Sequence, residues 1–301
     1  MKHAKPFLKW AGGKTQLLKD IRLLLPPDLH LAPFDYVEPF VGSGAVLFWM
    51  LNHFPNIRKA IINDVNADLV NAYRAIACSP EDLIKLLAQM QAEYTELAGN
   101  KEATQGYYYD KRSQFNLRKS TMLEQAALFI FLNRTCFNGL YRVNRNNQFN
   151  VPMGSHKKPK ICDADNLRAV SRALQKVEIR CGDFTKNQIG TCRPAFFYFD
   201  PPYKPLSQSS SFAAYARDGF NDKQQIRLHD FCAELDQLGY RWMLSNSDVR
   251  GHVAESEFFD TLYAGFHISR VKATRRINSN PLKRGELNEL LITNYSDARF
   301  S

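Results

Sequence analysis

The sequence predicts an α/β fold in which a mostly parallel sheet carries a large helical insertion. Five short apolar segments are separated by long connections or helical stretches, a pattern that is typical of parallel strands. Two more segments near the C-terminal end are joined by the polar loop Thr274–Gly285, which favours an antiparallel hairpin. The long stretch between Asp64 and Val177 has helical spacing instead. These three observations together indicate an open sheet that is interrupted by one helical segment.

The predicted strands fall into two groups. Those expected to be parallel are Asp35–Glu38, Ala60–Asn63, Val177–Arg180, Ala195–Asp200 and Arg241–Ser245. Those expected to form the antiparallel pair are His267–Ala273 and Leu287–Thr293. The uninterrupted apolar run that begins at Ala195 predicts a strand buried on both faces.

The helical segment between the second and third strands is expected to be an inserted domain. Pro80–Leu97 and Leu123–Asn133 show helical spacing, and Ser79-Pro80-Glu81-Asp82 is a plausible helix start because proline and acidic residues suit the first turn. A loop rich in Asn, Arg and Lys follows Asn133. We therefore expect residues 68–162 to form the insertion, and residues 1–67 and 163–301 to form the α/β domain.

Net charge, cysteine spacing and the length of apolar runs limit the classes of protein to which the chain can belong. The chain has 301 residues and a formal net charge of +10, which favours a polyanionic partner such as nucleic acid; a solvated basic face is the alternative. None of the six cysteines forms a C-x-x-C pair, so we expect a reduced, cytoplasmic protein without structural zinc. The N-terminal segment has no apolar h-region, so we expect no signal peptide, and no apolar run approaches the length of a membrane span.

The tetrapeptide Asp200-Pro201-Pro202-Tyr203 is the most informative motif. Two prolines cannot continue a central strand, so the chain must turn out at the carboxyl end of the strand, where ligands bind in open α/β sheets. The motif combines a carboxylate, the carbonyl of Pro201 and an aromatic face. These groups suit a flat base with an exocyclic amino group, which would donate to Asp200 and stack on Tyr203. The alternative is a plain proline turn.

A glycine turn follows the first predicted strand. In Val37–Val46 the residues Gly42 and Gly44 allow the backbone to approach a ligand closely. The third glycine of a dinucleotide fingerprint is missing, and so is the Gly-Lys-Ser/Thr ending of a phosphate loop, which favours a small nucleoside-like ligand. Asp64 ends the second strand, where a carboxylate binds a ribose diol in such sheets; it could instead cap the next helix.

The N-terminal segment Phe7–Lys14 contains two further candidates. Trp10 offers an apolar wall and Lys14 a cation that suits the carboxylate of an amino acid. The alternative is an ordinary N-terminal turn with a packed tryptophan.

These motifs, in this order, resemble the Dam-like family of DNA adenine-N6 methyltransferases, which includes restriction-system enzymes. The resemblance spans almost the whole chain and rests on Phe7–Lys14, Val37–Gly44, Asn133–Gly154, Asp200–Tyr203 and Ser245-Asn246. It implies a Rossmann-like catalytic domain with an inserted target-recognition domain. It also implies S-adenosylmethionine as the methyl donor, without a metal.

The resemblance assigns two sets of residues to the catalytic domain. The target adenine, flipped out of the duplex, would be held by Asp200, Pro201, Pro202 and Tyr203. The methyl donor would be bound by Trp10, Lys14, Glu38, Phe40, Gly42, Asp64, Asp183, Phe184 and Asp200.

The resemblance also assigns the residues that contact DNA. Phe137 would wedge into the base stack, Asn138 would help to fill the vacated space, and Leu140 would touch a thymine methyl group. Arg142 and Lys9 would bind guanines at the two ends of the site. The chain departs from the family pattern at Phe137 and at Ser155-His156. Basic residues that could compensate, or that could form solvated faces, are Lys157, Lys158, Arg275 and Arg276.

The expected reaction is therefore methylation of adenine N6 in duplex DNA, in the sequence GATC. Competing interpretations are another adenine site, cytosine N4, a nicotinamide oxidoreductase or a DNA-binding protein without catalysis. The expected partner is double-stranded DNA and not a membrane, and a cognate restriction endonuclease is a candidate functional partner. We expect a monomer in the cytoplasm, associated with a prokaryotic nucleoid or encoded by a phage.

Overall fold

The computed structural model describes residues 2–10, 14–156, 158–187, 194–204, 220–250, 257–274 and 286–296. The chain divides into two compact units. The first, called unit 1, comprises Met1–Gly13, Val41–His53 and Asn63–Gly182, and the second, unit 2, comprises Lys14–Phe40, Phe54–Ile62 and Asp183–Ser301.

The strands form a seven-stranded sheet in the order β3-β2-β1-β4-β5-β7-β6. They are β1 (Phe34–Glu38), β2 (Ile57–Asp64), β3 (Val177–Cys181), β4 (Ala195–Phe199), β5 (Arg241–Ser247), β6 (His267–Thr274) and β7 (Glu286–Thr293). The order from β3 to β5 is that of a doubly wound, Rossmann-like sheet. The predicted α/β class is confirmed, and each predicted strand overlaps an observed one.

The direction of the strands also follows the prediction. β1 pairs in parallel with β2 and with β4, and β4 pairs in parallel with β5. β6 and β7 are antiparallel, and β7 also runs antiparallel to β5. The loop predicted between β6 and β7 lies, after its first residue, outside the described residues.

The pairing of β1 with β4 fixes the place where a ligand is expected. β1 and β4 lie side by side while their next neighbours in chain order lie on opposite sides, which makes this pair the switch point of the sheet. The carboxyl ends of these two parallel strands lead to Glu38-Pro39-Phe40 and to Asp200-Pro201-Pro202-Tyr203. Topology therefore brings the two motifs to one edge of unit 2.

The core of unit 2 forms between the central strands and α9 (Asp222–Gln237). β4 is buried at every residue, as its apolar run predicts. Side chains on one face of the strands join apolar residues of α9 in a single cluster that includes Phe197, Phe199, Trp242, Leu244, Leu228, Phe231 and Leu235. Two shorter helices also belong to unit 2, α1 (Leu18–Leu24) and α10 (Phe258–Leu262).

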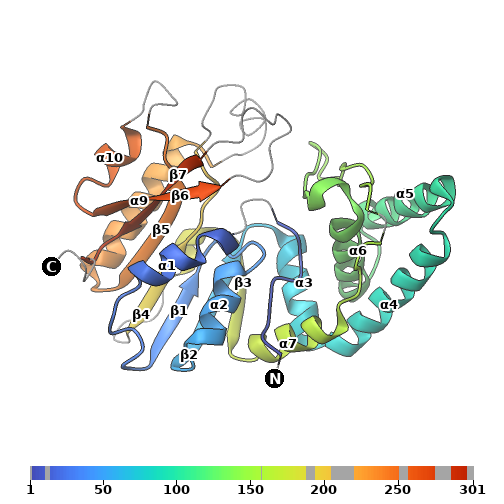
Figure 1. The fold of residues 1–301 in the computed structure, drawn as a ribbon, viewed down its shortest axis with the longest axis horizontal. Coiled ribbons are helices and arrows are strands. Elements are labelled where there is room, and N and C mark those ends of the chain that lie inside the picture. Colours follow the sequence, from blue (N-terminus) through green and yellow to red (C-terminus); the bar gives the residue numbers. More distant parts are fainter. Residues whose placement is uncertain are drawn as a thin grey trace. The chain divides into compact units, whose positions relative to one another are not determined.

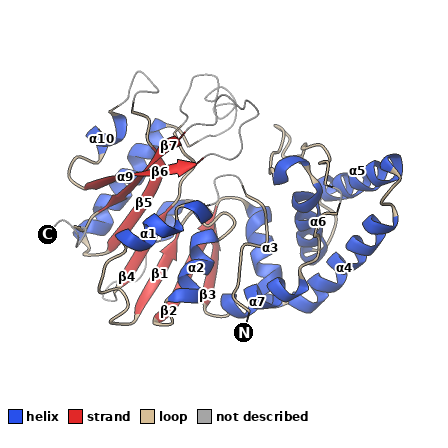
Figure 2. Ribbon diagram, in the orientation of Figure 1, coloured by secondary structure: helices blue, strands red, loops and turns tan. Residues whose placement is uncertain are grey.

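Between β2 and β3 the described residues form helices and loops (Figure 2). The helices are α3 (Ala67–Cys78), α4 (Pro80–Glu96), α5 (Lys101–Leu117), α6 (Met122–Thr135) and α7 (Ala164–Leu174), and α2 (Ala45–His53) precedes them. Both helices that the sequence predicted are present, as α4 and α6. Figure 1 shows α4, α5 and α6 packed together. The boundaries of an inserted domain at residues 68 and 162 remain a prediction.

Helix α6 is the centre of this helical group. Ten of its fourteen residues are buried, so the helix is apolar on nearly all sides. Its start is fixed by a capping box in which Thr121 and Glu124 each bond the other's backbone N–H.

Among the described residues, no helix combines the length and the apolar character that a membrane span requires.

Candidate active site and recognition segment

Asp200 follows β4 directly and is the centre of a small polar cluster in unit 2. Its Oδ1 atom accepts a hydrogen bond from Ser245 Oγ at 3.1 Å and lies 2.7 Å from Lys14 Nζ. Ser245 in turn lies 3.1 Å from the hydroxyl of Tyr198, which donates to it. Burial raises the pKa of Asp200, whereas Lys14 and the Ser245 hydrogen bond lower it. The carboxylate is thus a desolvated acceptor that two neighbours help to keep ionised.

Tyr203 lies beside this carboxylate. Its hydroxyl donates to Glu289 Oε2 of β7 at 2.6 Å, and Lys14 Nζ lies 4.3 Å from the centre of its ring. The hydroxyl therefore anchors the ring from its far end. The resemblance assigns Lys14 to binding of the methyl donor. In the structure its ammonium group pairs with the Asp200 carboxylate and lies over the Tyr203 ring. Its role toward the donor remains a prediction.

The other candidate donor residues of unit 2 form two groups. Glu38, at the end of β1, is 2% exposed and accepts a hydrogen bond from Tyr36 at 2.6 Å. Phe40 and Phe184 are aromatic neighbours, with ring centres 5.3 Å apart, and Phe220 packs against both. They form an aromatic cluster beyond the end of β1, in which Phe184 is buried and Phe40 is partly exposed.

Asp183 precedes Phe184 and is held by Arg227 of α9. Two guanidinium nitrogens of Arg227 donate to the carboxylate at 2.7 Å, and Thr185 adds a hydroxyl and a backbone donor. Arg227 lowers the pKa of Asp183 to about 2. Arg227 could not be recognised from the sequence as a site residue, because its position in α9 carries no motif of its own.

The glycine turn lies in unit 1 and is built around Asp64. Gly42 and Gly44 both have positive φ angles, +49° and +75°, which favour glycine. Asp64 accepts hydrogen bonds from the backbone N–H groups of Gly42 and Asn66, at 3.1 and 2.9 Å. The capping alternative for Asp64 is not what the structure shows, because Asn66 caps α3. Asp64 instead joins the glycine turn to the end of β2.

Trp10 packs over the glycine turn. A Cβ atom at Gly42 would come within 3.1 Å of its indole ring. The absence of a side chain at Gly42 therefore allows Trp10 to pack closely against the turn. Trp10 also stacks on Tyr141, with ring centres 5.9 Å apart. Tyr141 donates to Asp68 Oδ2 at 2.6 Å, and Asp68 pairs with Arg118. Tyr141, Asp68 and Arg118 could not be predicted as partners of Trp10 from the sequence, since their contacts join positions far apart in the chain.

The recognition segment, residues 137–142, contains predicted base-reading residues and begins at a tight turn, Phe137–Gly139. Phe137 is 51% exposed and Leu140 is 37% exposed, which is unusual for large apolar side chains in this protein. The buried amide of Asn133 accepts from the backbone N–H of Lys9 and donates to the carbonyl groups of Lys9 and Gly139. Asn133 therefore ties the turn to the Lys9 backbone.

Arg142 projects from the same segment and is exposed. Its Nε atom donates to Asn150 Oδ1 at 2.7 Å, which orients the guanidinium group across the segment. Asn138 adopts a positive φ of 54° within the turn. Phe137, Asn138, Leu140 and Arg142 are thus exposed, whereas Tyr141, between the last two, is partly buried.

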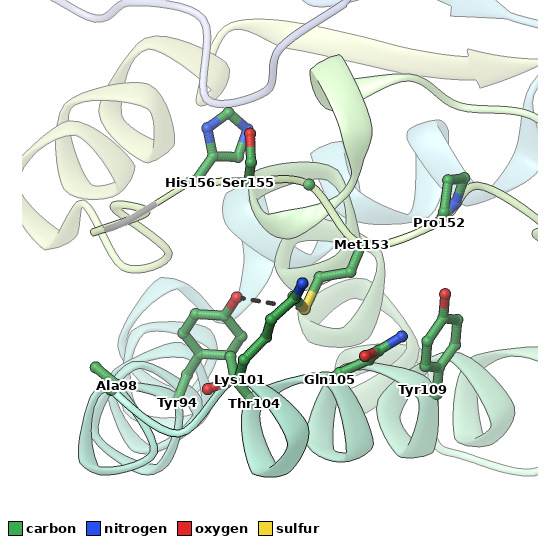
Figure 3. A pocket seen from close by; sticks show the side chains of 12 residues that line it. Tyr94, Ala98, Lys101, Thr104, Gln105, Tyr109, Pro152, Met153, Ser155 and His156 are labelled. Carbon is green, nitrogen blue, oxygen red and sulfur yellow. Dashed lines mark hydrogen bonds between the residues drawn. The ribbon is translucent and has the colours of Figure 1, made fainter.

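Behind the turn, unit 1 contains a cavity of about 720 Å³ (Figure 3). Side chains of α4 and α5, including Tyr94, Lys101 and Tyr109, face the segment that contains Met153 and His156. The backbone of this segment bonds to the turn, since Phe137 N–H donates to Pro152 and Gly154 N–H to Thr135. The cavity therefore adjoins the predicted base-reading segment.

Two positions that depart from the family pattern, Ser155 and His156, line this cavity. His156 Nε2 lies 3.2 Å from Lys9 Nζ, and burial together with this neighbouring cation lowers the pKa of His156. Lys158 is exposed. Lys157, Arg275 and Arg276 lie outside the described residues.

Comparison with known proteins identifies the family. The model of the D12 class N6 adenine-specific DNA methyltransferases matches residues 10–277, which include both strand-end motifs and the recognition segment. The chain belongs to this family. It is an adenine-specific DNA methyltransferase.

Similar proteins span nearly the full length of the chain. Type II methyltransferase M.MjaIII of Methanocaldococcus jannaschii is 46% identical, over 97% of this chain and 99% of that protein. Type II methyltransferase M1.LlaDCHI of Lactococcus lactis subsp. cremoris is 40% identical, over 97% and 96%. The DNA adenine methylase of Haemophilus influenzae is 34% identical, over 97% and 93%.

Proposed function

We propose that this methyltransferase transfers the methyl group of S-adenosylmethionine to N6 of adenine in duplex DNA, within the sequence GATC. The observation that carries the proposal is the cluster at the carboxyl end of β4. There a buried carboxylate with a serine donor lies beside an anchored tyrosine ring, in a protein of the adenine-specific family.

The residues present fit the proposed donor. A carboxylate offers about four lone pairs, so Asp64 keeps acceptor capacity for a ribose diol beside its three backbone donors, Gly42, Val65 and Asn66. Phe40 and Phe184 provide an aromatic surface for an adenine ring. The residues that would hold the donor are Trp10, Lys14, Glu38, Phe40, Gly42, Asp64, Asp183, Phe184 and Asp200. When bound, the donor supplies an electrophilic methyl group on a sulfonium.

The target base would be handled by the β4 tetrapeptide. An adenine inside a duplex must be flipped out to be reached, and its N6 lone pair is delocalised into the ring. Asp200 and the Pro201 carbonyl accept the amino hydrogens, which favours a pyramidal nitrogen and stabilises the positive charge that develops on it. Tyr203 stacks on the ring. With the donor bound, the N–CH₃ bond would form as the S–CH₃ bond breaks, and the proton that N6 loses would pass to solvent water.

The proposed sequence GATC rests on the base-reading residues. Arg142 is exposed and oriented by Asn150, as a side chain that binds a guanine edge would be. Leu140 presents an apolar surface for a thymine methyl group, and Lys9 lies beside the turn. The second candidate is another adenine site, because the chain carries Ser155-His156 where the family pattern differs. Two similar proteins have Type II names, so we also propose a restriction endonuclease as functional partner of a monomeric enzyme.

A methyl-transfer assay tests the proposal. The purified protein is incubated with methyl-labelled S-adenosylmethionine and a duplex that contains one GATC site. We expect label in N6-methyladenine. The matched control duplex already carries N6-methyladenine on both strands of that site and should accept no label. Label in cytosine, or equal labelling of the two duplexes, would contradict the proposed target.

A further inference from the structure

Two buried side chains of unit 2, Gln225 and Asn246, form a hydrogen-bonded relay behind the Asp200–Tyr203 tetrapeptide. Gln225 lies on α9 and Asn246 on β5, and the side chains of both are 0% exposed. Asn246 Nδ2 donates to Gln225 Oε1 at 3.1 Å. The two amides therefore join a helix and a strand through a polar contact within an apolar core.

Both ends of the relay bind the backbone of the turn. Gln225 Nε2 donates to the carbonyl of Pro202 at 3.2 Å, and Asn246 Oδ1 accepts from the backbone N–H of Lys204, also at 3.2 Å. These are the residues immediately before and after Tyr203. The two amides thus hold the backbone on each side of the ring that is proposed to stack on the target base.

The direction of the relay is fixed by the backbone groups at its ends. A carbonyl only accepts, so Gln225 must present its NH₂ group to Pro202. Asn246 Oδ1 also accepts from the Ser247 N–H at 2.9 Å, so its oxygen must face the two backbone donors. Proline gives this turn no N–H at positions 201 and 202, so it has few backbone hydrogen bonds of its own. The side-chain relay takes their place.

We propose that Gln225 and Asn246 are positioning residues, which set the placement of the Tyr203 ring and the Pro201 carbonyl relative to the Asp200 carboxylate. The inference rests on the proposed function of the tetrapeptide. Ser245, the residue before Asn246, bonds Asp200 itself. The end of β5 therefore binds Asp200 through Ser245, and binds Lys204, which follows the tetrapeptide, through Asn246.

The relay predicts a specific pattern of kinetic effects. Gln225→Met has similar length but no hydrogen-bonding group, so it releases the Pro202 carbonyl. We expect the single-turnover methylation rate, at saturating donor and DNA, to fall about ten- to a hundredfold, because small misplacements of reacting groups are costly. The KM for DNA should change little, since phosphate contacts dominate DNA affinity. Combined with Asn246→Leu, the losses should not multiply, because each change breaks the same relay.

The matched control is Gln125→Met. Gln125 is also a buried glutamine, and its Nε2 donates to a single backbone carbonyl, that of Phe115. We expect this variant to lose thermal stability without the fall in single-turnover rate. Should Gln225→Met fail to fold, Asn246→Asp is the second variant, because it keeps the acceptor for Lys204 and Ser247 and replaces the donor to Gln225 by a charged acceptor, which opposes Gln225 Oε1.

Hydrogen exchange of the tetrapeptide tests the relay without any activity measurement. We expect the amides of Tyr203 and Lys204 to exchange faster in Gln225→Met and Asn246→Leu than in the wild type or in Gln125→Met. If the wild-type protein methylated no DNA, the proposed function would fail while this exchange result still tested the relay. The inference would be overturned if Gln225→Met and Asn246→Leu showed the hydrogen-exchange rates of the wild type and single-turnover rates within about twofold of that of Gln125→Met.

Discussion

At the scale of single residues, burial and hydrogen bonding act on the Asp200 carboxyl group in opposite directions. Burial raises its pKa, while Lys14 and Ser245 favour the ionised form. The ionised carboxylate accepts a hydrogen bond from an amino group, whereas the protonated acid would compete as a donor. The identity of the neighbours of Asp200 should therefore decide the pH range in which the enzyme works.

Removal of the carboxylate tests its role directly. Asp200→Ala should lower the methylation rate by at least about a hundredfold, which is the usual cost of losing a main stabilising group. Duplex binding should persist, because it depends on other residues. Filter binding and labelled methyl transfer measure the two properties on the same sample. A variant that retained a sizeable fraction of wild-type turnover would show that Asp200 has another role.

Ser245→Ala tests the electrostatic part of the account. The serine hydroxyl donates to the ionised form of Asp200, so its loss should raise the pKa of that carboxyl further. Activity is lost as the pH falls through this pKa, and the acid limb of the kcat–pH profile should therefore move to higher pH in the variant. An unchanged acid limb, or a movement to lower pH, would be inconsistent with a hydrogen bond that favours the carboxylate.

At the scale of elements, local patterns predicted the strands and two helices, whereas contacts between distant positions could not be predicted. The apolar run of β4 and the prolines after it locate the tetrapeptide without a structure. No local pattern connects Gln225 of α9 to Pro202, Arg227 to Asp183, or Tyr141 to Trp10. These partners become visible only when the sheet and the helices place them together.

The recognition segment allows a test of base reading. A bidentate contact from arginine to guanine is worth about 1–3 kcal/mol of discrimination. Arg142→Ala should therefore relax selectivity at one guanine by roughly ten- to a hundredfold, with non-specific binding mostly intact. Arg145, an exposed arginine three residues after Arg142, supplies the matched control: Arg145→Ala should weaken binding without a change in selectivity. Equal effects of the two variants on selectivity would argue against direct reading by Arg142.

At the scale of the whole molecule, the net charge of +10 should govern the association with DNA. Each phosphate contact releases condensed counterions, so the logarithm of the binding constant should fall linearly and steeply with the logarithm of salt concentration. Fluorescence anisotropy with a labelled duplex measures this slope. A slope near zero would mean that phosphate contacts contribute little to binding.

We propose that this methyltransferase modifies adenine N6 in GATC through the cluster around Asp200. Single-base mapping of N6-methyladenine in the DNA of cells that make the protein tests this proposal, with cells that make the Asp200→Ala variant as the control. We expect modified adenine throughout the GATC sites in the first sample and unmodified sites in the second. Unmodified GATC sites in cells that make the active protein, or equal modification in both samples, would contradict it.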